Sequence, residues 1–241
     1  MACGPTPDDA TTGVTMSFSV SRGRTLDITG FGLEADDLPA WDGGSLDPRT
    51  LFTDPATPFE LEVGSGKGTF LVQQASIQTG TNFLGIEWTR EFFRYAADRM
   101  RRNGLTNIRM LRDDASEFVC HRCQSSVVDV IHLYFTDPWP KKRHHKRRVV
   151  QDSTMIAMHR ILKPSGRVHL VTDHDDLFAW YETHAERHAS LYSRSEFLPP
   201  GSAGDGEVVG TNFERKYQRE GRPFHAMTLT RINKDDDTNA S

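Results

Sequence analysis

Cysteine is scarce in this chain, which has three cysteines, Cys3, Cys120 and Cys123, among 241 residues. So few and so clustered, they exclude the disulfide framework of a small secreted domain. Long apolar runs are also missing, and no charged start followed by an apolar core opens the chain. We therefore expect a soluble, cytoplasmic protein without a membrane span. We interpret Cys120 and Cys123 as ordinary thiols, and the histidine spacing predicts no metal site.

An excess of positive charge is absent as well, because 33 acidic residues outnumber 29 lysines and arginines and leave a net charge of −4. This balance excludes a generally basic nucleic-acid coat protein. The cations gather instead in one segment, 141–148, where six of eight residues are lysine or arginine. A local basic cluster on an acidic background favours a transient encounter with nucleic acid.

The chain divides into four predicted parts. Residues 1–16 are rich in Pro, Gly, Thr and Asp and are predicted to be a disordered tail, with Met16 as an alternative start. Residues 17–58 are irregular and acidic, and we expect an arm that lies over the domain. Residues 59–231 are predicted to form that domain, and residues 232–241 a disordered acidic tail.

From Phe59 onward, short apolar strands alternate with helical patterns at the spacing of βαβ units. We therefore predict an α/β fold with a doubly wound, mostly parallel, Rossmann-like sheet of about seven strands. The last strand should run antiparallel, because no long crossover helix precedes it. The predicted strands are 59–63, 82–86, 107–111, 127–135, 167–172 and 224–229.

A glycine-rich loop, Gly64 to Gly68, joins the first of these strands to a helix. Gly64 and Gly66 let the backbone turn sharply and approach a ligand without a Cβ atom in the way. The third glycine arrives one residue too early for a dinucleotide fingerprint, and the loop does not satisfy the phosphate-loop pattern.

Carboxylates accompany three consecutive strands around this loop. Glu87 ends the second strand and suits ribose hydroxyls, whereas Asp114 follows the third and suits the amine of adenine. Glu62 precedes the glycines and suits an ammonium group. Three acids disfavour a pyrophosphate and favour a positively charged ligand, so S-adenosylmethionine fits better than NAD.

The buried strand 127–135 ends at Thr136-Asp137-Pro138-Trp139-Pro140, where the prolines stop regular structure. Ligands of open α/β sheets bind just beyond the carboxyl ends of strands. We expect Asp137 to meet a substrate there, beside the basic segment 141–148. From these residues alone, the reaction that we infer is methyl transfer onto a nucleic-acid base. An NAD-dependent oxidoreductase and a non-catalytic RNA-binding module stay open as alternatives.

The segments LEVGSGKG, FLGIEW, DDA, FTDPWPKKRHHKRR, ILKPSG, VTDHDD and TNFERK occur in this order between about Phe59 and Leu229. Together they resemble the bacterial tRNA (guanine-N7-)-methyltransferase family. The proline–tryptophan–basic block is the most specific part, because many methyltransferases share the glycine loop. The resemblance implies a class I methyltransferase domain that uses S-adenosylmethionine, with N7 of a guanosine in tRNA, at variable-loop position 46, as acceptor.

The resemblance also implies roles for individual residues. Asp137 is implied to be catalytic and to share in cofactor binding with Glu62, Gly64, Gly66, Glu87 and Asp114. Substrate binding is expected at Lys141, Asp173, Thr211, Asn212, Phe213 and Glu214. RNA contacts are expected at Arg143, His144, His145, Lys146, Arg147 and Arg148. The sequence leaves open whether the protein is a monomer or a homodimer.

Overall fold

The computed structural model describes residues 25–38 and 45–233. The predicted tail 1–16, including Met16, lies outside the described residues, as does residue range 234–241 of the predicted acidic tail.

The described chain folds into one eight-stranded sheet with the order β1-β4-β3-β2-β5-β6-β8-β7. All neighbouring strands are parallel except β8, which runs antiparallel to both β6 and β7. The predicted doubly wound, mostly parallel sheet with an antiparallel last strand is confirmed. The strands are β1 (Gly32–Glu34), β2 (Phe59–Val63), β3 (Asn82–Ile86), β4 (Ile108–Arg112), β5 (Val128–Tyr134), β6 (Leu162–Thr172), β7 (Tyr192–Ser195) and β8 (His225–Arg231).

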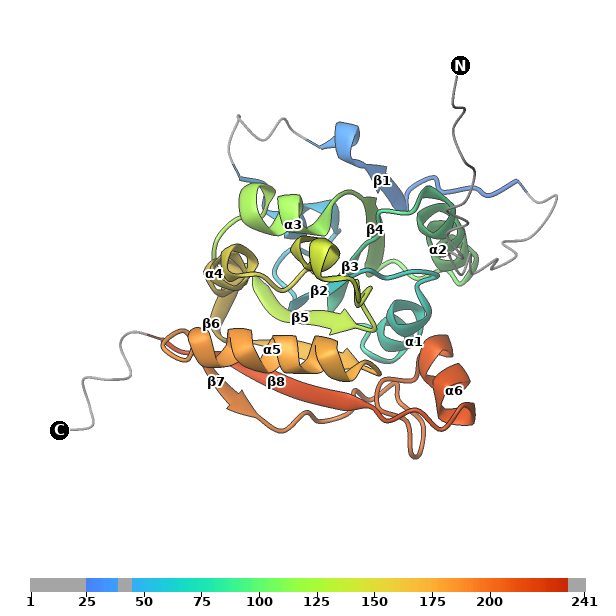
Figure 1. The fold of residues 1–241 in the computed structure, drawn as a ribbon. Coiled ribbons are helices and arrows are strands. Elements are labelled where there is room, and N and C mark those ends of the chain that lie inside the picture. The colour runs from blue at the N-terminus through green and yellow to red at the C-terminus, as the bar shows by residue number, and fades with distance from the viewer. Residues whose placement is uncertain (1–24, 39–44, 234–241) are drawn as a thin grey trace, which may run out of the picture.

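Helices cover both faces of the sheet, with α3, α4 and α5 gathered on one side and α1, α2 and α6 on the other (Figure 1). Each face therefore buries its own apolar cluster, one including Leu61, Ile131 and Tyr181 and the other including Phe70 and Phe93. The α-helices are α1 (Thr69–Ile77), α2 (Arg90–Arg102), α3 (Ala115–Glu117), α4 (Asp152–Ile161), α5 (Asp175–Arg187) and α6 (Asn212–Arg219). Shorter helical turns are η1 (Ala35–Asp37), η3 (Pro48–Leu51), η4 (Phe118–Arg122) and η5 (Lys142–Arg147).

The sheet has one strand more than the seven expected, and two of its strands, β1 and β7, were not predicted. Strand β1 comes from the predicted arm and pairs in parallel with β4 at the sheet edge. Its three residues are too few to show an alternating pattern, so only tertiary pairing reveals it. The arm also reaches the domain at Leu46, whose N–H donates to the carbonyl of Arg122 at 2.7 Å.

The basic segment and the following helix also differ from expectation. The helical spacing of apolar residues predicts a helix from about Arg148 to Leu162. The helix begins instead at Asp152, and residues 142–147 form the separate turn η5. Gln151 starts α4 with a capping box, in which its N–H donates to the Thr154 hydroxyl at 2.9 Å. Such a cap fixes the helix start and leaves the basic residues in their own short turn.

The strand order places a topological switch point between β2 and β5. From β2 the chain winds outward through β3 to β4, and then crosses back to add β5 on the other side of β2. At such a point the loops after the two central strands diverge and leave a crevice. The glycine loop after β2 and the loop of Asp137 after β5 therefore border the same opening.

Within residues 25–38 and 45–233, no helix is long and apolar enough to cross a membrane. The same residues bring no three His, Cys, Asp or Glu side chains together in a metal-binding arrangement. Cys120 and Cys123 are both free thiols, and burial raises the pKa of Cys123 to about 12.

Candidate active site

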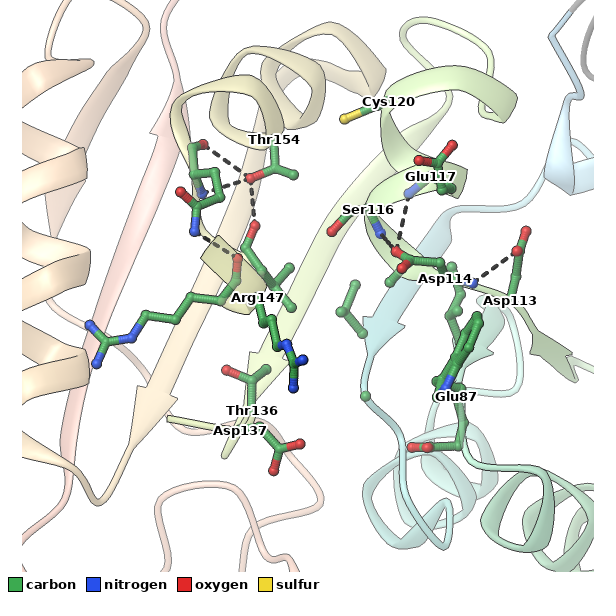
Figure 2. A pocket seen from close by; sticks show the side chains of 18 of the residues that line it. Glu87, Asp113, Asp114, Ser116, Glu117, Cys120, Thr136, Asp137, Arg147 and Thr154 are labelled. Carbon is green, nitrogen blue, oxygen red and sulfur yellow. Dashed lines mark hydrogen bonds between the residues drawn. The ribbon is translucent and has the colours of Figure 1, made fainter. Parts of the chain in front are cut away.

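A cleft of about 1190 Å³ opens at the switch point. Figure 2 shows Glu87 and Asp114 on one side of it, and Asp137 with Arg147 on the other. Gly64 and Gly66 also line this cleft, so the structure brings most of the predicted cofactor residues together.

The glycine loop lines the cleft, and its backbone adopts φ angles that favour glycine. Gly64 and Gly66 have φ angles of 76° and 52°, which side chains rarely adopt. A Cβ atom on Gly64 would meet nothing within 4 Å, so that side of the loop is open to a ligand. The N–H groups of Gly64 and Ser65 donate to the carbonyl of Ile86, and that of Gly68 donates to the carbonyl of Ser65. Because these N–H groups are engaged within the protein, they cannot donate to a phosphate as the loop of a phosphate cradle does.

Glu87 fastens the loop to the end of β3. Its carboxylate accepts the N–H of Gly66 at 2.8 Å through Oε2 and that of Thr89 at 2.7 Å through Oε1. An ionised carboxylate has about four acceptor positions, so each oxygen keeps capacity for one further donor. Two adjacent ribose hydroxyls match that remaining capacity.

Asp114 begins α3. Its Oδ1 accepts the N–H groups of Ser116 and Glu117 at 2.8 and 3.3 Å, as the dashed lines in Figure 2 show. This N-cap anchors Oδ1 and leaves Oδ2 of a cleft-lining carboxylate for an adenine amine. The neighbouring Asp113 has a different partner, because its carboxylate lies 3.5 Å from Nε of Arg122.

Glu62 lines a second, smaller pocket of about 280 Å³ that shares Gly64 and Gly66 with the main cleft. The side chain is buried, and its Oε2 atom has no hydrogen-bond partner in the described structure. Burial, reinforced by the charge of Glu87, raises the pKa of Glu62 to about 8. A buried, unsatisfied carboxylate disfavours its own charge until a cation arrives, so this position fits a ligand ammonium group.

The loop after β5 presents Asp137 at the mouth of the cleft, where its side chain is exposed. Phe135 and Trp139 have left-handed φ angles of 53° and 42°. Non-glycine residues in this region cost free energy, and they concentrate where a fixed loop shape serves function. The Thr136 hydroxyl holds the loop to α5 through a 2.9 Å hydrogen bond with the Tyr181 hydroxyl.

The predicted RNA-contact residues have different surroundings. Arg143, Lys146 and Arg147 are exposed, as is the predicted substrate residue Lys141. The guanidinium of Arg147 lies 4.9 Å from the ring centre of Trp139. His144 and His145 are partly buried. Partial desolvation, followed by the neighbouring cations, lowers the pKa of His144.

Arg148, another predicted RNA contact, differs from its exposed neighbours, because only 2% of its surface is exposed. Its Nε donates to the carbonyl of Pro138 at 2.9 Å, its Nη2 pairs with Asp176, and its guanidinium lies 5.0 Å from the ring centre of Trp180. Arg148 therefore fastens the loop of Asp137 to α5 from inside.

The predicted substrate residues between β7 and β8 organise α6. Thr211 is its N-cap and accepts the N–H of Glu214 at 3.1 Å. The fully buried Glu214 carboxylate accepts the N–H groups of Val209 and Gly210 at 2.9 and 2.8 Å and also that of Val208. Both side chains thus shape the backbone that presents α6. The side chain of Asn212 lies outside the described structure.

Phe213 and Asp173 complete this region. Phe213 lines both the cleft and the smaller pocket. Asp173 follows β6 and pairs with Nη1 of Arg222 at 2.8 Å, which ties the segment after α6 to the sheet edge. The substrate-binding roles of these residues stay predictions.

Three residues at the site escaped the sequence reasoning. The amphipathic pattern of the helix after Thr89 predicts one buried face for Phe92 and Phe93. Phe92 lines both pockets instead, because successive helical residues point about 100° apart. Trp88 lines the cleft and is 68% exposed, and its position directly after Glu87 was the available signal. Lys216 lines the smaller pocket, two residues beyond the quoted motif residue Glu214.

Solved structures with a similar fold are methyltransferases. The 16S rRNA methyltransferase KamB matches with a TM-score of 0.54 and 15% identity, over 73% of this chain and 88% of that chain. The aminoglycoside resistance methyltransferase NpmB1 matches with a TM-score of 0.51 and 16% identity, over 73% and 89%. At this identity the likeness concerns the fold. It shows that this chain shares the fold of these methyltransferases.

Sequence relatives narrow this class. Residues 56–227 match the family described as "Putative methyltransferase". The tRNA (guanine-N(7)-)-methyltransferase of Nitrosococcus oceani is 40% identical over 74% of this chain and 73% of its own length. Those of Nitrobacter hamburgensis and Rhodopseudomonas palustris are 35% and 34% identical, over 74% and 90% of this chain and 70% and 88% of their lengths. The chain belongs to the tRNA (guanine-N7-)-methyltransferase family.

Proposed function

We propose that this protein transfers a methyl group from S-adenosylmethionine to N7 of a guanosine in tRNA. The observation that carries the proposal is the position of Asp137 between the cofactor cleft and the exposed cations of η5. Family membership supports the reaction. The variable-loop guanosine as the target rests on the resemblance, and a cytoplasmic location follows from a tRNA substrate.

Bound S-adenosylmethionine supplies an electrophilic methyl group on a sulfonium. Guanine N7 carries a lone pair and no proton, so the reaction needs no general base. The chain's task is to hold N7 in line with the methyl group, since positioning can lower the barrier by several kcal/mol. Asp137 can accept hydrogen bonds from guanine N1–H and the exocyclic amine, which orients the base and stabilises it as N7 becomes cationic.

The exposed residues of η5 would bind backbone phosphates next to the target nucleotide. Lys146 and Arg147 line the cleft that Asp137 enters, so a phosphate held there lies close to the acceptor base. Arg147 also covers the Trp139 ring, which couples phosphate binding to the shape of the Asp137 loop.

The decisive experiment is incubation with unmodified tRNA and methyl-labelled cofactor, followed by borohydride and aniline treatment, which cleaves RNA at 7-methylguanosine. We expect label transfer and strand scission at one site. Label transfer without scission would contradict N7 as the acceptor. Asp137→Ala should lose turnover while still binding S-adenosylhomocysteine, and wild-type turnover in this variant would exclude the orienting role.

The division of labour can be tested with two variants. Glu87→Ala should weaken cofactor binding and leave tRNA affinity nearly intact. The triple variant with alanine at Arg143, Lys146 and Arg147 should bind tRNA more weakly, with a salt dependence reduced by roughly one unit of slope per lost phosphate contact. Unchanged tRNA binding across salt concentrations would show that η5 is a solvated surface.

A further inference from the structure

Helix α6 closes the smaller pocket, although resemblance associates its first turn with the substrate. Thr211, Phe213 and Lys216 line this pocket together with Glu62 and the glycine loop. A Cβ atom built on Gly66 would lie 4.0 Å from Cε2 of Phe213, so the first turn of α6 lies directly over the loop.

The pocket separates charges of opposite sign. Glu62 is buried in its wall, with Oε2 unsatisfied. Lys216 also lines the pocket, and its side chain is 42% exposed. Lys67 of the glycine loop is a second cation at this pocket, with Nζ 5.7 Å from the ring centre of Tyr95.

Lys216 is loosely held in this arrangement. Its Nζ lies 3.9 Å from Oε1 of Glu220 and 5.3 Å from the ring centre of Tyr217. A half-exposed ion pair at this distance contributes little, so the ammonium can turn toward a ligand at small cost.

Four N–H groups of the glycine loop donate within the protein and are not available to an anion. Gly64, Ser65 and Gly68 donate their N–H groups to carbonyls of the protein, and Gly66 donates to Glu87. Lys67 and Lys216 are the cationic residues of the pocket lining, so they are the charged donors that a ligand carboxylate would meet there.

We propose that Lys216, assisted by Lys67, binds the α-carboxylate at the amino-acid end of the cofactor while Glu62 receives its α-ammonium. The inference rests on the proposed use of S-adenosylmethionine. The pocket then recognises the zwitterion through two opposite charges, and α6 serves as the wall that completes the cofactor site.

The test compares two ligands that differ only in the carboxylate. S-adenosylhomocysteine carries both charges, whereas S-adenosyl-3-thiopropylamine keeps the ammonium and lacks the carboxylate. Calorimetry should show that Lys216→Gln weakens S-adenosylhomocysteine about tenfold, in the range of one charge-assisted hydrogen bond, and leaves the thiopropylamine unchanged. Lys216→Arg should retain most of the affinity. Arg219→Gln, an exposed position on the same helix, is the matched control.

Other outcomes overturn the assignment. Equal weakening of both ligands would indicate a general disturbance of the pocket, and no weakening of either would remove Lys216 from the site. Weaker tRNA binding with normal S-adenosylhomocysteine affinity would make Lys216 an RNA contact instead. Failure of the wild-type protein to bind S-adenosylhomocysteine would contradict the proposed function itself, which separates the two failures.

Discussion

Cofactor affinity should depend on pH through Glu62. Burial raises the pKa of this carboxyl to about 8, so it is mostly protonated near neutrality when no ligand is bound. A ligand ammonium favours the ionised form, and binding must then release the proton. Affinity therefore rises with pH until the pH reaches the pKa of the free protein.

The size of the effect follows from the ionised fraction. With a pKa of about 8, roughly 1% of Glu62 is ionised at pH 6 and roughly 9% at pH 7. The affinity for S-adenosylhomocysteine should therefore increase about ninefold between these values, with about 0.9 proton released per ligand at pH 7. The increase levels off as the pH approaches the pKa of Glu62, about 8.

Calorimetry in two buffers with different ionisation enthalpies measures both the affinity and the protons released. Glu62→Gln should bind more weakly at pH 7 and should lose the dependence on pH between 6 and 7. Glu91→Gln, an exposed carboxyl on α2, should behave as the wild-type protein does. The same pH slope in Glu62→Gln, or no proton release by the wild-type protein, would refute the reasoning.

Three further predictions concern the framework of the site. Arg148→Ala should lower the free energy of unfolding by about 2 kcal/mol in urea denaturation and also reduce turnover, because a buried guanidinium that holds Pro138 is lost. The control Lys142→Ala, at an exposed position, should change the free energy of unfolding by less than about 0.5 kcal/mol. Equal stabilities of the two variants would contradict the anchoring role of Arg148. Gly68→Ala should lower the free energy of unfolding by about 1–3 kcal/mol, because the φ angle of Gly68 is 64° and a Cβ atom there would lie 3.0 Å from a methionine methyl of α2. Gly80→Ala is the control and should leave the free energy of unfolding nearly unchanged, because its Cβ atom would meet nothing within 4 Å. Trp88→Ala should weaken the binding of S-adenosylhomocysteine about three- to tenfold, because the exposed ring lines the cleft beside Glu87. It should also remove most of the tryptophan fluorescence change on binding. An unchanged affinity would place Trp88 outside the adenosine site.

Local sequence determined the parts of this protein that depend on neighbouring residues. Three local signals each mark the end of a strand and the loop that follows it. They are the glycine spacing after β2, the acid at the end of β3 and the prolines that end regular structure after β5. Because parallel strands present their carboxyl ends at one edge, these local signals sufficed to predict that Glu87, Asp114 and Asp137 share a cleft.

Only the tertiary structure decided which way individual side chains point and what covers them. Arg148 reads as one cation among six, yet packing against α5 buries it and makes it an anchor for the Asp137 loop. Lys216 lies about 150 residues from Glu62 along the chain, and the turn of α6 over the glycine loop brings both to one pocket. Such contacts depend on the sum of many packing interactions across distant segments, and no local pattern of charge or hydrophobicity encodes them.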